Sequence, residues 1–274
     1  MTELPLVTAF PYCHDCVRFR SGPAVACLAC ASSQVSRPGP GACPVCAQHV
    51  PDNGRCPNEL CRQPGRRIGK ISALGYQTGP LRRAIHSYKY GGVRSWSVPL
   101  GRLLLGWLEQ NMTADPPDLI VVNPTYPGAD VPGGTVLGHT VLGHTVPGGT
   151  VLGETALGRT ALGHTEAVVH AAAAADSAHR WPFDIATPAA IVKIRPTLKS
   201  ADAQAWSKRV TATELRDALA VPDPGRTAGR FILVYDDICT TGGQLDAIAG
   251  CLLDEGSAER VEGLVLARAL WRGR

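Results

Sequence analysis

The sequence of 274 residues predicts an α/β protein, in which a parallel sheet carries helices on both faces and a small cysteine-rich module precedes it. Three observations support this fold class. Eight of the ten cysteines lie before residue 62. After them, apolar runs of strand length alternate with segments of helical spacing. Apolar residues make up 45% of the chain, enough for a sizeable core, and charged residues only 18%, which argues against disorder.

Composition and charge exclude several classes of protein. The formal net charge of +4 is too mild to require a nucleic-acid or membrane partner, and aromatic residues, at 5%, are too few for extensive base stacking. No apolar run approaches the ~20 residues of a membrane-spanning helix. Residues 1–10 lack the basic start and long apolar stretch of a signal peptide, so we expect a cytoplasmic protein.

The cysteines of residues 1–70 occur in close pairs, three C-x2-C and one C-x4-C. Four thiolates complete a tetrahedral zinc site, so eight cysteines predict two structural Zn2+ sites in a double zinc-ribbon-like module. A disulfide framework is the poorer alternative without an export signal. In-order pairing is the simplest arrangement, and an interleaved one stays open. The predicted ligands are Cys13, Cys16, Cys27, Cys30, Cys43, Cys46, Cys56 and Cys61.

This module has few large apolar residues, so metal binding would supply its folding free energy. Its formal charge is +4, from eight basic and four acidic residues. Each Zn2+ with four thiolates carries a charge of −2, so two sites cancel the positive charge. We therefore expect the module to be structural or to dock a partner, and its charge gives little support to DNA binding.

Residues 71–274 are predicted to form one domain in which strands and helices alternate. It begins with a short strand at 71–76. Apolar residues then recur at helical spacing over 81–88, and a glycine pair ends that helix. A second amphipathic helix covers 100–108, and the apolar run within 118–123 predicts a buried strand.

The remaining predicted elements complete the alternation. Several of the strands are continuously apolar, which is typical of a parallel sheet covered on both faces. In order, these elements are a helix at 165–178, a strand at 190–194, a helix at 201–219, a strand at 231–235, a helix at 245–253 and a strand at 261–267.

Residues 131–165 are a different kind of sequence, seven tandem pentapeptides with Gly at the third and Thr at the fifth position of each unit. A period of five fits neither an amphipathic helix nor a half-buried strand. A pentapeptide β-helix would need more coils than seven units supply. We therefore expect a repeat-expanded loop inserted into the domain surface.

The segment with the clearest chemistry joins the strand at 231–235 to the helix at 245–253. Glycines let the backbone approach an anion, and N–H groups at a helix N-terminus hold phosphates. Two carboxylates beside that loop would repel a phosphate, but they suit the vicinal hydroxyls of a ribose. A plain helix cap is the alternative. The predicted ribose 5-phosphate site comprises Asp236 and Asp237, then Thr240, Thr241, Gly242, Gly243 and Gln244.

This stretch resembles the loop of type I phosphoribosyltransferases that binds phosphoribosyl pyrophosphate (PRPP): an apolar strand, Asp-Asp, three residues and Thr-Gly. With zinc-type cysteine pairs before it, the chain resembles the ComF competence-protein family, to which residues 76–92 and 193–209 are also similar. The resemblance implies a type I phosphoribosyltransferase fold that binds PRPP with Mg2+. It implies catalytic roles for Asp236 and Asp237 and phosphate binding by residues 240–244.

The chain departs from the family pattern at three points. Gln244 replaces the usual Thr or Ser at the end of the loop. Thr240 replaces the acid that 6-oxopurine transferases carry, which disfavours hypoxanthine or guanine salvage. After residues 123–126, the repeats stand where the family has an Arg-Gly-Phe-Asn-Gln segment, near the expected pyrophosphate site. Binding of PRPP is therefore better supported than its turnover.

Two functions remain open at this point. The first is a Mg2+-dependent phosphoribosyltransferase that releases pyrophosphate, which the Asp-Asp pair and the Thr-Thr-Gly sequence favour. The second is a non-catalytic PRPP sensor, or an adaptor in DNA uptake or processing, that docks partners through its zinc module. Lys89, Lys193 and Arg195 are weighed as pyrophosphate contacts against ordinary solvated charges.

Overall fold

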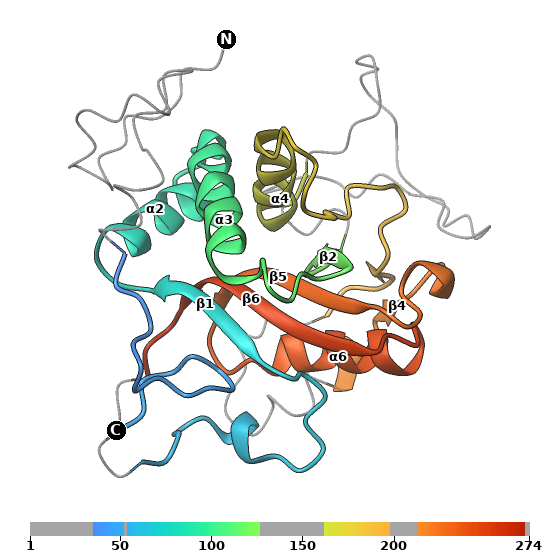
Figure 1. Cartoon of the computed structure of the whole chain (residues 1–274), viewed down its shortest axis with the longest axis horizontal. Helices are drawn as coiled ribbons and strands as arrows, with labels where there is room; N and C mark the ends of the chain where they lie inside the picture. The colour runs from blue at the N-terminus through green and yellow to red at the C-terminus, as the bar shows by residue number, and fades with distance from the viewer. Residues whose placement is uncertain (1–34, 52–53, 127–161, 198–212, 272–274) are drawn as a thin grey trace.

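A computed structural model describes residues 35–51, 54–126, 162–197 and 213–271 of the chain (Figure 1). Strands and helices alternate along these residues, so the chain has an α/β fold, as predicted. The helices are α2 (Gly79–Tyr90), α3 (Ser97–Asn111), α4 (His164–Ala175) and α6 (Gly243–Asp254), with short 3-10 turns η2 (Glu59–Arg62), η3 (Arg94–Trp96) and η4 (Pro224–Arg226). The strands are β1 (Ile71–Tyr76), β2 (Leu119–Val122), β3 (Val192–Lys193), β4 (Leu219–Ala220), β5 (Phe231–Cys239) and β6 (Arg260–Arg268).

Four strands of the described residues form one parallel sheet in the order β1-β6-β5-β2. All of β2 and the first seven residues of β5 are buried. Alternate side chains of β5 enter different cores, with Ile232 and Val234 on one face and Leu233 and Tyr235 on the other. Because both faces are covered, these strands need the continuous apolar runs that the sequence shows.

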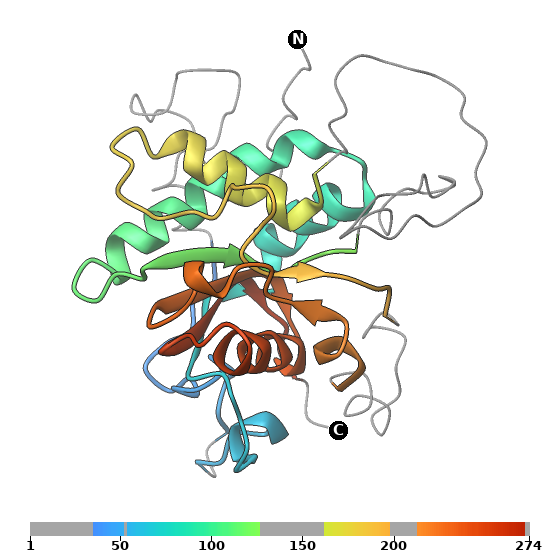
Figure 2. The same cartoon turned by 90° about the vertical axis from the view of Figure 1, so that its right-hand side faces the viewer.

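Helices cover both faces of this sheet, as expected. Figure 1 and Figure 2 show α2, α3 and α4 on one face and α6 on the other. α3 and α4 approach closely because Gly101 has no side chain; a Cβ there would lie 2.7 Å from the Ala172 nitrogen. The buried Tyr88 of α2 donates its hydroxyl to the His164 carbonyl at 2.6 Å, which joins α2 to the start of α4.

One predicted strand does not join the main sheet. Residues 190–194 contain only the short strand β3, which pairs antiparallel with β4. The free edge of β2 is occupied by residues 182–184, which exchange backbone hydrogen bonds with Ile120 at 2.8 and 2.9 Å. Most of the helix expected at 201–219 lies outside the described residues. The helix does not extend to its predicted last residue, because Leu219–Ala220 forms β4.

The predicted repeat loop, residues 131–165, falls almost entirely outside the described residues. Its last two residues, His164 and Thr165, belong to α4. The helix expected at 165–178 is therefore present with slightly different ends. Among the described residues, no helix has the length and apolar character needed to cross a membrane.

Candidate functional site

Asp236 and Asp237 lie in the last part of β5, at the carboxyl edge of the sheet. The sequence predicted that the strand ends at Tyr235, but β5 continues to Cys239 because β6 is long enough to pair with it that far. β2, on the other side, ends opposite Tyr235. The two carboxylates therefore follow directly after the last paired position of β2, at the edge where ligands of open α/β sheets bind.

Both carboxylates are buried, and they have different partners. Asp237 forms an ion pair of 2.6 Å with Nζ of Lys89, near the end of α2. Asp236 accepts the N–H of Asp237 at 2.8 Å and a hydrogen bond from the side chain of Asn123. Burial, and then the negative charge of Asp237, raises the pKa of Asp236 to about 7. The site thus combines a carboxylate held by a lysine with one that titrates near neutral pH.

Of the three basic residues weighed as pyrophosphate contacts, Lys89 is the one whose described contacts reach the Asp pair. Burial alone would lower the pKa of Lys89, but the charge of Asp237 outweighs it and raises that pKa above its usual value. Lys193 lies in the short strand β3, and Arg195 forms an exposed ion pair with Asp217 at 3.7 Å. Lys89 is therefore a cation fixed within the site.

The segment Thr240–Gln244, called the anion loop from here on, turns sharply into α6 at Gly242. The φ angle of Gly242 is 86°, in the left-handed region that favours glycine. A Cβ at Gly242 would lie 2.7 Å from Ile71 and 2.8 Å from Leu60, so this position faces the core. At Gly243 the nearest atom to a Cβ would be the Thr241 hydroxyl at 3.7 Å. Gly242 makes the turn, and Gly243 is the glycine that leaves room for an anion.

The carbonyl groups of the anion loop are held from behind. The Thr240 carbonyl accepts a hydrogen bond from the Arg268 guanidinium, and the Thr241 carbonyl accepts one from Nδ2 of Asn58 at 2.9 Å. In a trans peptide the N–H of the next residue points away from the carbonyl, so the N–H groups of Thr241 and Gly242 face away from these donors. Within the described residues neither N–H has an acceptor. An anion would satisfy both.

Gln244 links the anion loop to the Asp pair. Its Nε2 donates to Oδ1 of Asn123 at 3.1 Å, so the Asn123 amide nitrogen is the group left to donate to Asp236. The family that the sequence resembles has a hydroxyl at this position, whereas this chain has an amide that orients Asn123. The departure at Gln244 therefore has a structural role on the ribose side of the predicted site.

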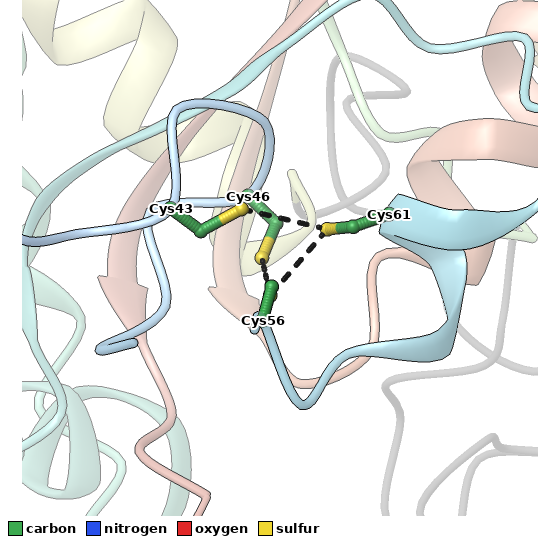
Figure 3. Close-up of side chains that lie close together, drawn as sticks. All are labelled: Cys43, Cys46, Cys56 and Cys61. Atoms are coloured by element: carbon green, nitrogen blue, oxygen red, sulfur yellow. Dashed lines mark hydrogen bonds between the residues drawn. The ribbon is translucent and has the colours of Figure 1, made fainter. Parts of the chain in front are cut away.

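Four of the eight predicted zinc ligands lie together; Figure 3 shows their side chains pointing toward one another. Their Sγ atoms all lie within 4.8 Å of one another, and three of the distances are 3.7 Å. A tetrahedron with Zn–S bonds of about 2.3 Å has edges of about 3.8 Å, so this spacing fits a zinc ion. The cysteine cluster consists of Cys43, Cys46, Cys56 and Cys61. The other four predicted ligands lie outside the described residues; they are Cys13, Cys16, Cys27 and Cys30.

The thiols of the cysteine cluster differ in acidity. Burial raises the pKa of Cys56 to about 11 and also raises that of Cys61. At Cys46 burial is outweighed by hydrogen bonds from the Asn58 side chain and the Gln48 backbone, and its pKa falls to about 7. A bound Zn2+ would favour the thiolate at all four positions, so the cluster has the chemistry of a metal site. The cluster groups the last four of the eight cysteines, as in-order pairing predicts.

Sequence reasoning missed Asn123, Arg268 and Asn58 as parts of the site. Asn123 follows β2, and Arg268 is the last residue of β6. Because the carboxyl ends of parallel strands meet at one edge, the polar residue at the end of each predicted strand was a usable signal. Asn58 gave no such signal, since its contact with the anion loop depends on how the cysteine-rich segment packs.

Comparison with known proteins assigns no family to the chain. No protein-family model matches it, and a search of the curated proteins finds no relative. The functional conclusion therefore depends on the residues and geometry of the site.

Proposed function

We propose that the chain binds a phosphoribosyl compound, PRPP with Mg2+, at the carboxyl edge of its sheet. The observation that carries this proposal is the anion loop, which follows the Asp pair closely and in which, within the described residues, the N–H groups of Thr241 and Gly242 have no acceptor. A phosphate accepts such donors, and ribose hydroxyls donate to carboxylates. A ribose 5-phosphate carries both groups in one molecule.

In the transferase version of this function, Asp236 and Asp237 hold the two ribose hydroxyls. Their negative charge stabilises the positive charge that develops at the anomeric carbon as the bond to pyrophosphate breaks. Lys89 fixes the position of Asp237 through its 2.6 Å ion pair. Mg2+ bound with the pyrophosphate supplies the charge neutralisation that this leaving group requires.

A second version is a PRPP sensor or adaptor without turnover. It is favoured because the Asp pair carries little net negative charge. Lys89 neutralises Asp237, and burial raises the pKa of Asp236 to about 7. The pair therefore offers little net negative charge to a developing cation at neutral pH. Ribose hydroxyls also bind to a neutralised pair, although more weakly than to a free carboxylate, so this balance affects turnover more than binding.

The first test is calorimetric titration of Mg-PRPP into the zinc-loaded chain. We expect saturable binding at one site, weakened at least tenfold by Asp236→Asn or Asp237→Asn. Asp115→Asn is the matched control, because Asp115 is an exposed carboxylate paired with Arg260 at 2.7 Å near the opposite edge of the sheet. Absence of binding by the unaltered chain would refute both versions of the proposal.

A pyrophosphate-release assay then separates the two versions. With a panel of nucleobases and amines as acceptors, the transferase version predicts release that Asp236→Asn slows about a hundredfold. The rate falls more than the affinity, because the charge on the sugar develops only along the reaction. The sensor version predicts PRPP binding with no release above the Asp236→Asn background for any acceptor.

A further inference from the structure

Arg268, the last residue of β6, is fully buried, and within the described residues it pairs with no carboxylate. Its Nη1 donates to the carbonyl of Cys239 at 2.7 Å and to that of Thr240, and its Nη2 lies 3.8 Å from Sγ of Cys46. A guanidinium stays charged in proteins, and burying it without an anion costs several kcal/mol. The anionic group that it reaches is the cysteine cluster, which carries a charge of −2 with Zn2+ bound.

The loop that carries the last two cysteines also contacts the anion loop directly. The Asn58 amide, which is 1% exposed, hydrogen-bonds both the Thr241 carbonyl, at 2.9 Å, and the Cys46 thiol. Leu60 packs beneath Gly242, where its Cδ2 would lie 2.8 Å from an added Cβ. Two residues between metal ligands therefore form part of the support of the anion loop.

We infer that the metal in the cysteine cluster sets the geometry of the anion loop, with Arg268 as the positioning residue that connects them. This inference rests on the proposed function, since the ligand of that loop is the phosphate of a phosphoribosyl compound. With zinc bound, the two cysteine loops are crosslinked, and Asn58 and Leu60 are held against Thr241 and Gly242. Arg268 is then compensated by the tetrathiolate, and the loop carbonyls stay turned away from the ligand.

Loss of the metal removes this support. A site of four cysteines on two loops has little apolar burial to keep its shape, so its geometry depends on the ion. Once Asn58 and Arg268 release the carbonyls of Thr241 and Thr240, these two peptide groups are no longer held in their present orientation, and their N–H groups lose their fixed position. Metal occupancy thereby controls phosphate affinity, and thermodynamic linkage requires the reverse: a bound phosphate must tighten zinc binding by the same factor.

The test measures zinc transfer from the full-length, zinc-loaded chain to a chromogenic chelator, with and without saturating ribose 5-phosphate. Calorimetry on the same sample establishes saturation. The release phase of the cysteine cluster is the one that is missing in Cys61→Ser. We expect ribose 5-phosphate to slow this phase at least fivefold, the lower end of typical couplings between two sites. The bound phosphate holds the anion loop against Asn58 and Leu60, and therefore holds the segment between Cys56 and Cys61 that must move for the ion to leave. Equal rates in the presence and absence of bound ribose 5-phosphate would overturn the inference.

Arg268→Met tests the positioning role, because it keeps an unbranched apolar stem and removes the charge and the donors. We expect it to retain zinc while the rate ratio falls to about one. Arg260→Met, at the other end of the same strand, should keep the wild-type ratio. If Arg268→Met does not fold, Asn58→Ala provides the second variant, with a ratio expected to fall by at least half. A wild-type ratio in the folded Arg268 variant would exclude Arg268 as the connection.

The same experiment distinguishes failure of this inference from failure of the proposed function. If zinc-loaded wild-type protein binds no ribose 5-phosphate or Mg-PRPP, the proposed function is wrong and the coupling falls with it. If it binds them while zinc release is unaffected, the proposed function stands, and the cysteine cluster is then a structural site with no influence on the anion loop.

Discussion

The two ends of β6 each carry an arginine, and their surroundings differ completely. Arg260, at the amino end, has a side chain 41% exposed, lies 3.7 Å from the centre of the Phe231 ring and pairs with Asp115. Arg268, at the carboxyl end, is fully buried between the anion loop and the cysteine cluster. Water screens the first charge, whereas the second must be compensated by the protein itself. An arginine thus lies at the surface at one end of β6, and at the other end a buried arginine supports the anion loop.

The comparison extends to the other charges at the carboxyl edge. Asp236 and Asp237 are buried there, and Lys89 is held against them. Buried charges reduce stability unless they are well partnered, so their concentration around one loop makes this end of the sheet the candidate site. Substitutions at the two ends of β6, and in the cysteine cluster compared with a cysteine outside it, test whether the carboxyl end differs in this way.

The largest effect is expected from Cys61→Ser. It leaves three thiolate ligands in the cysteine cluster, so we expect the zinc content to fall by about one ion per chain from about two. The unfolding free energy should fall by more than about 4 kcal/mol, as is typical for loss of a structural metal. Elemental analysis and denaturant unfolding measure both.

Cys251→Ser is the control, since Cys251 is buried in α6 outside the cluster. It should keep the full zinc content and cost about 1–2 kcal/mol, the desolvation of a buried hydroxyl. If Cys61→Ser also kept its zinc, the assignment of the cysteine cluster as a metal site would be wrong.

Arg268→Met and Arg260→Met compare the two ends of β6 directly. Removing the buried guanidinium leaves the tetrathiolate without its compensating charge, for which we expect a loss of about 3–5 kcal/mol in unfolding free energy. The carbonyls of Cys239 and Thr240 each lose one donor and keep another, the Ala269 N–H and the Trp271 indole. Arg260→Met removes an exposed ion pair and should cost less than about 1 kcal/mol. Urea unfolding of zinc-loaded protein measures the difference, and equal costs would show that burial does not distinguish the two arginines.

The pH dependence of ligand binding tests the protonation of Asp236, whose pKa is raised to about 7 by burial. The carboxylate is the stronger acceptor of ribose hydroxyls, so affinity for ribose 5-phosphate should rise roughly tenfold from pH 6 to pH 8. The phosphate itself ionises near pH 6, so the informative quantity is the ratio of wild-type to Asp236→Asn affinity at each pH. A ratio independent of pH would contradict this role.

The same group affects stability with a defined sign. Its pKa is higher in the folded protein than in the unfolded chain, so the folded state binds the proton more tightly between about pH 4 and pH 7. The contribution of Asp236 to the unfolding free energy is therefore present below that range and is lost as the pH rises through it. Asp236→Asn should remove this part of the pH dependence in denaturant unfolding.

Much of the fold followed from local patterns. The apolar runs at 71–76 and 231–235 and the helical spacing over 81–88 predicted elements that are present, because strands buried on two faces and amphipathic helices leave strong signatures. The strand expected at 190–194 is present only as the short β3, and it lies outside the main sheet. A β-branched run does not reveal that residues 182–184 already occupy the edge of β2.

Sequence reasoning predicted only those parts of the candidate site whose residues lie close together in the chain. Cysteine spacing identified the four ligands that lie together, and the Asp-Asp and Thr-Thr-Gly-Gly stretch placed carboxylates and a glycine turn at one edge. The contacts of Asn58 and Arg268 with the anion loop join residues that lie 183 and 28 positions apart in the chain. Such contacts arise from packing, and no local period or spacing encodes them.

The smallest expected effect is that of Gln244→Thr, which restores the hydroxyl that the resembling family carries. It breaks the hydrogen bond from Nε2 to Asn123, at 3.1 Å, with a net cost of about 1 kcal/mol in unfolding free energy. A hydroxyl at this last position of the anion loop adds a donor in the first turn of α6, so inorganic phosphate should bind about threefold more tightly. Ribose 5-phosphate should gain less, because Asn123 is no longer oriented toward Asp236.

The control for this prediction is Gln110→Thr, at an exposed position of α3, which should change neither affinity. If Gln244→Thr weakened phosphate as much as ribose 5-phosphate, the amide would be acting on the anion loop itself, and the separation of a phosphate side from a ribose side would be wrong.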